Sequence, residues 1–132
     1  FSASGADDLA PVDAQAQAPS PPDGVTINGQ SLSSDDVTLR SDAPIVLAWS
    51  AESQGDFVYV DLETSKGSKN SSLRCSLADT GAGQIDAASL PASDLRLSLH
   101  RVRTTPLKSG STEVGIARFD FAVTGRAKVA LP

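Results

Sequence analysis

Few residues of this chain are suited to catalysis. The chain has one histidine, His100, and one cysteine, Cys75. A hydrolytic triad needs a histidine as general base beside its nucleophile, and no G-x-S-x-G motif accompanies His100. His100 instead shares an alternation with Arg96 and Ser98, on the side of an expected strand that faces solvent. The sequence therefore predicts a protein that is not an enzyme.

Metal ligands are similarly sparse. One histidine and one cysteine nearly exclude a zinc or iron site with nitrogen and sulfur ligands. Calcium needs only oxygen ligands, and Asp35 and Asp36 could supply two of them. Asp42 or Asp56 could add a third after folding. The spacing matches no EF-hand loop, and a solvated acidic loop is the favoured interpretation. We therefore expect no metal and no other cofactor.

Two aromatic residues suggest a different kind of site. Phe57 and Tyr59 alternate with Val58, Val60 and Leu62, so they share one face of an expected strand. Aromatic side chains exposed on a β-sandwich can stack on sugar rings, which makes a carbohydrate-binding module the alternative function. Packing beneath a second layer or beneath the N-terminal segment would hide both rings. The glycan hypothesis therefore requires them to be exposed and coplanar.

Basic residues in the second half of the chain are further candidates for binding. They could gather on one sheet edge and its tip, and bind an acidic partner or the acidic face of a neighbouring copy. Charges along an edge strand also discourage edge-to-edge association, which is the simpler interpretation. These bases are Arg96, Arg101, Arg103, Lys108 and Arg118. The complete set of candidate binding residues is Phe57, Tyr59, Arg96, His100, Arg101 and Arg103.

Charge is distributed unevenly along the chain. Residues 1–65 hold eleven acids and one base, for a net charge of −10, and residues 66–132 hold ten bases and five acids, for +5. The two halves either neutralise each other within the fold or form a dipolar module suited to head-to-tail contacts. We favour the first interpretation, because surface charge pairs are common and individually weak. The net charge of −5 argues against nucleic acid or an anionic membrane as the partner. Membrane insertion is not expected either, because no apolar run approaches roughly 20 residues.

The stretch Ile45–Ser50 predicts the centre of the fold. Ile45, Leu47 and Trp49 alternate with Val46 and Ala48, so both faces of this stretch are apolar. Such a run is typical of a central strand that is covered on both sides. Trp49 is the only tryptophan, and we expect it to be buried between two sheets.

Turn signals divide the rest of the chain into strands. Asn28-Gly29 favours a type I′ hairpin turn, and polar loops, including one from Thr104 to Glu113, separate further alternating segments. Val102 breaks the alternation of Leu95, Leu97 and Leu99, which predicts a bulge or a strand end near Arg101. A second change of alternation predicts another bulge between Ile116 and Ala117.

The domain predicted over residues 24–132 is all-β. It is an antiparallel two-sheet β-sandwich of about eight short strands, with a closed barrel as the alternative. Residues 1–23 are rich in proline and alanine and have no sustained apolar period. They are interpreted as an extended linker or tail, with docking through Leu9, Pro11 and Val12 as the alternative.

A strand that ends in tryptophan, Ile45–Ser50, precedes an aromatic strand, Phe57–Leu62. This order resembles the B–C region of immunoglobulin-like and fibronectin type III-like domains. The segment from Cys75 through Asp79-x-Gly81 to the strand of Leu95, Leu97 and Leu99 is similar to a pattern in β-sandwich domains of uncharacterised bacterial secreted and cell-envelope proteins. A single cysteine leaves no partner for the disulfide of antibody domains, which excludes that branch.

The resemblance implies a non-catalytic module of a secreted or cell-envelope protein. Such domains act as spacers or adhesion modules, in contact with a protein partner or a neighbouring domain of the same chain. They share no catalytic residues that map onto this sequence.

Overall fold

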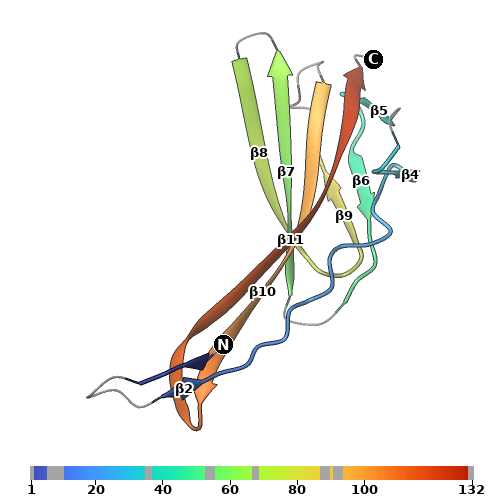
Figure 1. Ribbon diagram of the computed structural model, residues 1–132. Helices are drawn as coiled ribbons and strands as arrows, with labels where there is room; N and C mark the ends of the chain where they lie inside the picture. Colours follow the sequence, from blue (N-terminus) through green and yellow to red (C-terminus); the bar gives the residue numbers. More distant parts are fainter. Residues whose placement is uncertain are drawn as a thin grey trace.

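The computed structural model describes residues 2–5, 11–34, 37–52, 56–66, 69–86, 90 and 94–130. Within these ranges all regular secondary structure is β, in eleven strands (Figure 1). The all-β class predicted from the sequence is confirmed. Over the same ranges, no helix has the length and apolar character needed to cross a membrane.

The strands form two main sheets and one small one. The five-stranded sheet has the order β5 (Val37–Arg40), β11 (Thr112–Ala130), β10 (Asp94–Ser109), β7 (Phe57–Lys66) and β8 (Lys69–Ala78). The four-stranded sheet has the order β4 (Gln30–Ser31), β3 (Thr26–Ile27), β6 (Ile45–Ala48) and β9 (Ala82–Ile85). Near the N-terminus, β1 (Ser2–Ala3) pairs with β2 (Val12–Asp13). The pairing of β5 with β11 is parallel, which departs from the purely antiparallel prediction.

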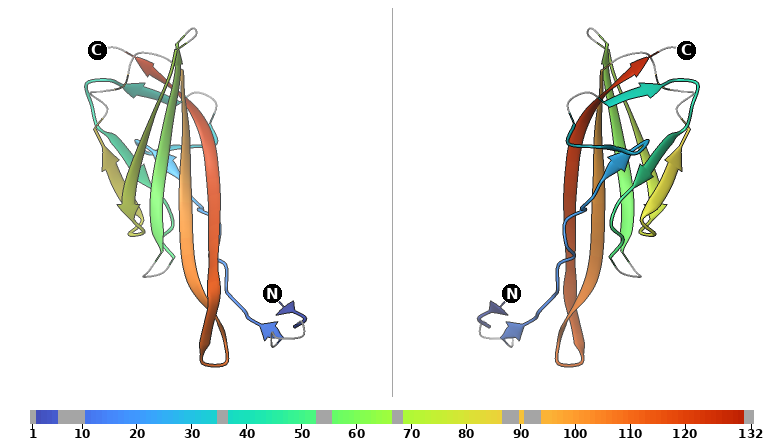
Figure 2. Two further views of the ribbon diagram at one scale, coloured as in Figure 1. Left: turned by 90° about the vertical axis from the view of Figure 1, so that its left-hand side faces the viewer. Right: turned by 90° about the vertical axis from the view of Figure 1, so that its right-hand side faces the viewer.

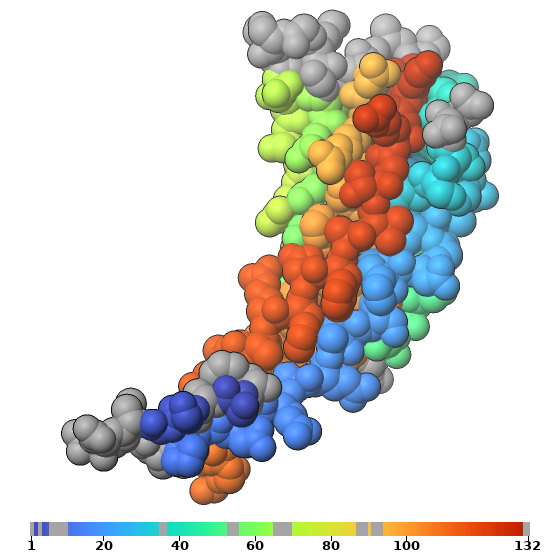
Figure 3. Space-filling model, in the orientation of Figure 1, coloured from blue at the N-terminus to red at the C-terminus, as the bar shows by residue number. Residues whose placement is uncertain are grey.

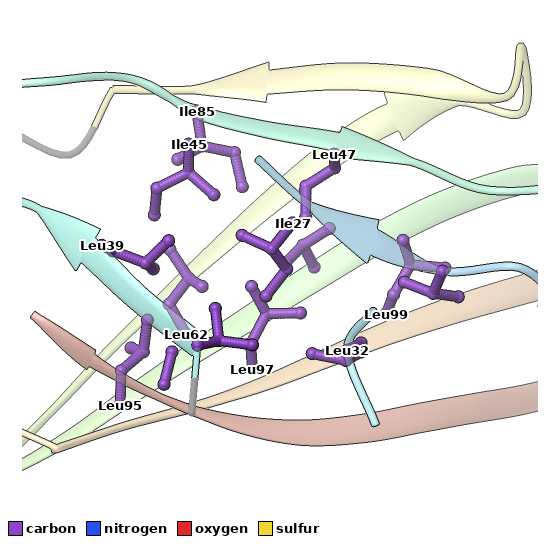
Figure 4. Packing of buried hydrophobic residues seen from close by; sticks show 14 of the residues in the cluster. Ile27, Leu32, Leu39, Ile45, Leu47, Leu62, Ile85, Leu95, Leu97 and Leu99 are labelled. Carbon is purple, nitrogen blue, oxygen red and sulfur yellow. The ribbon is translucent and has the colours of Figure 1, made fainter. Parts of the chain in front are cut away.

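The hydrophobic core lies between the two main sheets, which Figure 2 shows as separate layers. Figure 4 shows leucine and isoleucine side chains from both sheets pointing toward one another. The β7 and β10 contributions are the alternating residues Val58, Val60, Leu62, Leu95, Leu97 and Leu99, each at most 1% exposed. Alternation along a strand places every second side chain on the core face, so these positions followed directly from the sequence.

Trp49 follows β6 and is 5% exposed within this core, which confirms the prediction that it is buried. The expectation that both faces of β6 are covered is wrong. Ile45 and Leu47 are fully buried, whereas Val46 is 47% exposed. The reason is that the five-stranded sheet covers only one face of the smaller sheet. Val46 and Ala48 lie on the opposite face, toward solvent.

The predicted Asn28-Gly29 hairpin is confirmed. β3 and β4 pair antiparallel on either side of this dipeptide. Asn28 has φ 49° and Gly29 has φ 78°, the two left-handed conformations that a type I′ turn requires. The Asn28 side chain also accepts a hydrogen bond from the Val46 amide at 2.8 Å, which ties the turn to β6.

β10 and β11 are far longer than the short strands predicted. The pairing of β10 with β7 ends at Val102, and that of β11 with β5 begins at Ala127. Beyond Val102, β10 and β11 continue as a two-stranded arm, residues 103–118, at the lower end of Figure 1. The segment from Thr104 to Glu113, predicted to be a loop, thus consists mainly of paired strands.

Neither predicted bulge is present. The ladder between β10 and β11 shifts register only between Leu107 and Lys108, where Val114 is the extra residue. It runs without a break past Arg101 and past Ile116. The alternation continues unchanged: Arg101 points inward like Leu99, and Val102 points outward like His100. The strand therefore needs no bulge at this position.

Residues 11–23 run beside the arm (Figures 1 and 3). Ala14 is 2% exposed, and Pro19 and Pro22 are buried. Within this segment, the carbonyl of Gln17 accepts a hydrogen bond from Arg103 at 3.4 Å. Leu9 lies outside the described residues. The interpretation of residues 1–23 as a linker stays a prediction.

Candidate functional site on the five-stranded sheet

Tyr59 and His100, two of the predicted site residues, are directly opposite each other on β7 and β10. Both side chains lie on the outer face of the five-stranded sheet, away from the core. Their rings stack with centroids 4.2 Å apart and an interplanar angle of 14°. The antiparallel register thus joins two residues that are 41 positions apart in the sequence.

Asp120 of β11 binds both rings. One carboxylate oxygen accepts a hydrogen bond from the Tyr59 hydroxyl at 2.7 Å, and the other lies 2.8 Å from Nδ1 of His100. Because a carboxylate accepts and does not donate, Nδ1 carries the hydrogen of this bond. Nε2 of His100 lies 3.9 Å from Asp61. The imidazole is therefore held between two acids.

Arg74 of β8 closes the cluster on its other side. Its guanidinium donates two hydrogen bonds to Asp61, at 2.6 and 2.7 Å. The guanidinium carbon also lies 4.3 Å from the centre of the Tyr59 ring, in a cation–π contact. Tyr59 thus has His100 on one neighbouring strand and Arg74 on the other, and it is only 6% exposed.

The network shifts the titration of its members. Burial, together with the hydrogen bond to Asp120, raises the pKa of Tyr59 to about 12. Burial alone would raise the pKa of Asp120, but the hydrogen bonds from Tyr59 and His100 outweigh it and hold that pKa below its usual range. The bonds from Arg74 lower the pKa of Asp61. At neutral pH the cluster therefore contains a neutral phenol that donates to the ionised carboxylate of Asp120, beside the ionised carboxylate of Asp61.

This arrangement contains no free nucleophile. The Tyr59 hydroxyl is bonded to Asp120, and the nearby Ser98 hydroxyl shares a hydrogen bond of 2.9 Å with Thr124. It also lacks the aromatic platform that the glycan hypothesis requires. Phe57 is 40% exposed, but Tyr59 is covered by its neighbours.

Arg101 is not the surface base that the sequence suggested. It lies on the inner face of β10, and its side chain is 2% exposed. Its Nε donates to Asp79 at 2.8 Å, and its Nη2 donates to the carbonyl of Ser50. Asp79 also accepts a hydrogen bond from the Trp49 indole at 2.6 Å. The physical reason is alternation, because Arg101 occupies the inward position after Leu99, where a buried carboxylate compensates its charge.

Arg103, two residues further along β10, lies on the same inner face. It donates two hydrogen bonds to Asp56, at 2.7 and 2.8 Å, and contacts Glu52 at 3.3 Å. Glu52 also lies 3.3 Å from Arg101. The sequence did not identify Asp79, Asp56 and Glu52 as partners of these arginines, because they are distant along the chain. One signal was available in the sequence. Arg101 and Arg103 continue the alternation of the inward-facing leucines, and a buried arginine requires an acidic partner.

The acids considered for calcium are engaged elsewhere or not described. Asp42 binds Arg40 with two hydrogen bonds, and Asp56 binds Arg103. Asp35 and Asp36 lie outside the described residues. Over the described part of the chain, no group of three or more histidine, cysteine or acidic residues is placed to hold a metal ion.

Comparison of the chain with models of protein families, with curated proteins and with solved structures finds no match. The immunoglobulin-like resemblance therefore stays a prediction, and function has to be argued from the geometry.

Ion pairs between the two halves of the chain account for much of the charge asymmetry. Acids before residue 65 pair with bases after it in five contacts, which supports neutralisation within the fold. The pairs are Glu52–Arg101, Glu52–Arg103, Asp56–Arg103, Asp61–Arg74 and Glu63–Arg96. The last of these is long, at 3.8 Å, and its arginine is 62% exposed.

Arg96 lines a groove formed near the ends of β7 and β11 and the starts of β8 and β10. These strand ends lie opposite the arm, at the upper end of the sheet in Figure 1. The groove has a volume of about 910 Å³. It is lined by residues from four strands, β7, β8, β10 and β11. Of the predicted site residues, Arg96 alone lines it. Tyr59 and His100 lie in the middle of the sheet, and Arg101 and Arg103 lie on the other face, so the six candidates do not form one site.

Proposed function

We propose that this chain is a non-catalytic, immunoglobulin-like β-sandwich module of a secreted or cell-envelope protein, which acts in structure or protein contact. The observation that carries the proposal is the closure of the polar cluster around His100. Its imidazole lies between Asp120 and Asp61, and Tyr59 is occupied by Asp120. A general base needs a nucleophile beside its free nitrogen, and here Nε2 of His100 faces the Asp61 carboxylate at 3.9 Å while the nearby Tyr59 hydroxyl is already bonded to Asp120.

The strand order supports the immunoglobulin-like part of the proposal. Immunoglobulin sandwiches place strands A, B and E in one sheet and C, F and G in the other, and variable-type domains add C′ beside C. The same arrangement results if β3, β6 and β9 correspond to A, B and E. β7, β10 and β11 then take the places of C, F and G, and β8 that of C′. Trp49 would end strand B.

The arm is the element that favours protein contact. Its two strands pair with each other, but the outer edges of residues 103–109 and 112–118 have no strand partner among the described residues. Unpaired edges present hydrogen-bonding groups to other chains. Ile116 is 65% exposed and Val114 is 40% exposed, so the arm also offers apolar surface. We place the contact with a protein partner or a neighbouring domain here.

Two measurements test the proposal. Hydrolysis of ester, peptide and glycoside substrates by the chain should not exceed the background, and turnover that disappears in His100→Ala would overturn the non-catalytic assignment. For the contact, a photo-reactive amino acid is placed at Ile116 and, as a matched control, at Val46, which is 47% exposed on the other sheet. We expect a crosslinked adduct at position 116 alone. Excess unlabelled chain should compete for it, whereas an Ile116→Asp chain should not. Equal adducts at both positions would contradict a contact through the arm.

A further inference from the structure

The groove at the upper end of the five-stranded sheet contains an unfavourable pair of charges. Arg96 of β10 and Arg126 of β11 are directly opposite in the ladder, on the outer face. Like charges at directly opposite positions destabilise a sheet. Among the described residues, Glu63, 3.8 Å from Arg96, is the one ion-pair partner of these two arginines, and Asp94, two residues before Arg96, is a second acid in the groove. A costly pair of cations that faces a groove points to an anionic ligand.

Lys128 extends this basic wall. It follows Arg126 by two residues, so it lies on the same face of β11, and it also lines the groove. The apolar residues at this level, Leu95 and Ala127, are 1% and 4% exposed and offer little surface to a ligand. The groove volume of about 910 Å³ is within the range of small-ligand sites. The ligand is therefore recognised by charge and hydrogen bonds and not by apolar packing.

The other lining residues restrict the class of anion. Glu63 and Asp94 place two carboxylates in the same groove, and Asn70 and Ser72 add an amide and a hydroxyl from β8. A densely charged ligand such as polyphosphate would be repelled by the carboxylates. A ligand with separated acidic groups and many hydroxyls suits both the acidic and the basic residues of the groove. Its hydroxyls donate to the carboxylates, and its acidic groups accept from the arginines.

An acidic peptide fits this groove less well than a sugar. The backbone groups of β7, β10 and β11 at the groove are already used in the ladders between these strands. A peptide laid over these three strands would find no backbone partners there. Among the described strands, β8 at the edge of the sheet has one unpaired side, and the oligoglutamate titration below tests whether a peptide uses it. We propose that the groove binds an acidic polysaccharide of the uronate type, with its carboxylates on Arg96, Arg126 and Lys128. The proposal is independent of the arm, which lies at the other end of β10.

The ligand class is tested by calorimetric titration of the complete chain at low ionic strength. Oligogalacturonate should bind, and the affinity should fall as salt is added, because charged contacts are screened. Methyl-esterified oligogalacturonate, which lacks the charge, should not bind. Equal or tighter binding of oligoglutamate would assign the groove to acidic peptides and overturn the polysaccharide assignment. Absence of binding by any of these probes would overturn the anion site itself.

Two variants separate the site from the general charge of the protein. Arg126→Gln should weaken oligogalacturonate binding about tenfold, the loss expected from one charge-assisted contact. Arg118→Gln makes the same change on the same face of β11, outside the groove, and should leave the affinity nearly unchanged. Equal losses would indicate a diffuse field and contradict the site.

The melting temperature provides a second readout. Because Arg126→Gln removes the repulsion with Arg96, the melting temperature should stay the same or rise. A clear fall in the melting temperature would show that Arg126 stabilises the fold. It would contradict the proposal that Arg126 serves ligand binding at a cost in stability. Neither result depends on the crosslinking outcome for the arm, so the two proposals can fail separately.

Discussion

Arg101 donates a hydrogen bond to Asp79 over 2.8 Å, with side chains that are 2% and 1% exposed. Asp79 follows β8, and its carboxylate also accepts the hydrogen bond from Trp49, the residue that follows β6. One carboxylate therefore connects the largest core side chain of the smaller sheet with the central strand of the larger one. Among the described residues, no buried side-chain nitrogen or oxygen lacks a partner.

Removal of the Asp79 carboxylate should be strongly destabilising. Asp79→Ala leaves the Arg101 charge buried without its closest acid, and loss of one partner of a buried pair costs about 3–5 kcal/mol. Urea unfolding followed by circular dichroism measures the change in the free energy of unfolding. The control is Asp42→Ala, which removes the exposed partner of Arg40 and should leave stability within experimental error. Similar losses in both variants would contradict the special role of the buried pair.

The core around this ion pair could be predicted because alternation is a local property. Each of Leu95, Leu97 and Leu99 lies two residues from the next, and the same period identifies Val58, Val60 and Leu62. Burial of Trp49 followed from its apolar neighbours. The strand alternation therefore located the core without knowledge of which strands pair.

The partners of charged residues could not be predicted in this way. Arg101 fits the inward alternation, but its type favours solvent, and the acid that permits its burial is 22 positions away. The length of β10 and β11 was missed for a related reason. Most of residues 104–113 are polar. A mostly polar run without apolar alternation predicts a loop, because the sequence does not show that a second strand pairs with it.

Trp49→Ala should lower the free energy of unfolding by about 3–5 kcal/mol, because it leaves a large cavity between the sheets. Trp49→Phe retains most of the apolar volume but removes the indole hydrogen bond to Asp79, and should cost less. Circular dichroism is the appropriate measurement, since both variants remove the only tryptophan fluorophore. Because both variants lack the indole hydrogen bond, equal losses would show that this bond, and not the packing, accounts for the effect.

Gly125 of β11 is placed where a side chain has no room. A Cβ atom there would collide with the carbonyl oxygen and side chain of Leu32. A backbone oxygen cannot rotate away as a flexible side chain does, so Gly125→Ala should destabilise the fold by about 1–3 kcal/mol. Gly115→Ala is the matched control on the same strand, because the nearest atom to its Cβ, in Leu107, would be 4.0 Å away. Thermal unfolding of both variants checks the difference, and equal melting temperatures would contradict it.

Tyr59 should titrate far above the ordinary range of a phenol. Burial and the hydrogen bond to Asp120 raise its pKa to about 12, whereas an unfolded tyrosine titrates near about 10. Because the folded state binds this proton more tightly, the stability that Tyr59 contributes is fully present below about pH 10. It is lost as the pH rises toward about 12. The chain has one tyrosine, so phenolate absorbance reports this residue alone, in the native protein and in urea.

Asp120→Asn tests the origin of that shift. The amide keeps the shape of the side chain but removes the negative charge that opposes ionisation of the phenol, so the pKa of Tyr59 should fall, while the larger contribution, from burial, should remain. Asp94→Asn is the control, because it removes an acid from the same face of the sheet without a contact to Tyr59. Two results would contradict the hydrogen-bonded cluster. One is a Tyr59 pKa in the native protein equal to that in urea. The other is the same Tyr59 pKa in the Asp120→Asn variant and in the Asp94→Asn control. The expected result would show that the outer-face network is closed in solution, as the non-catalytic proposal requires.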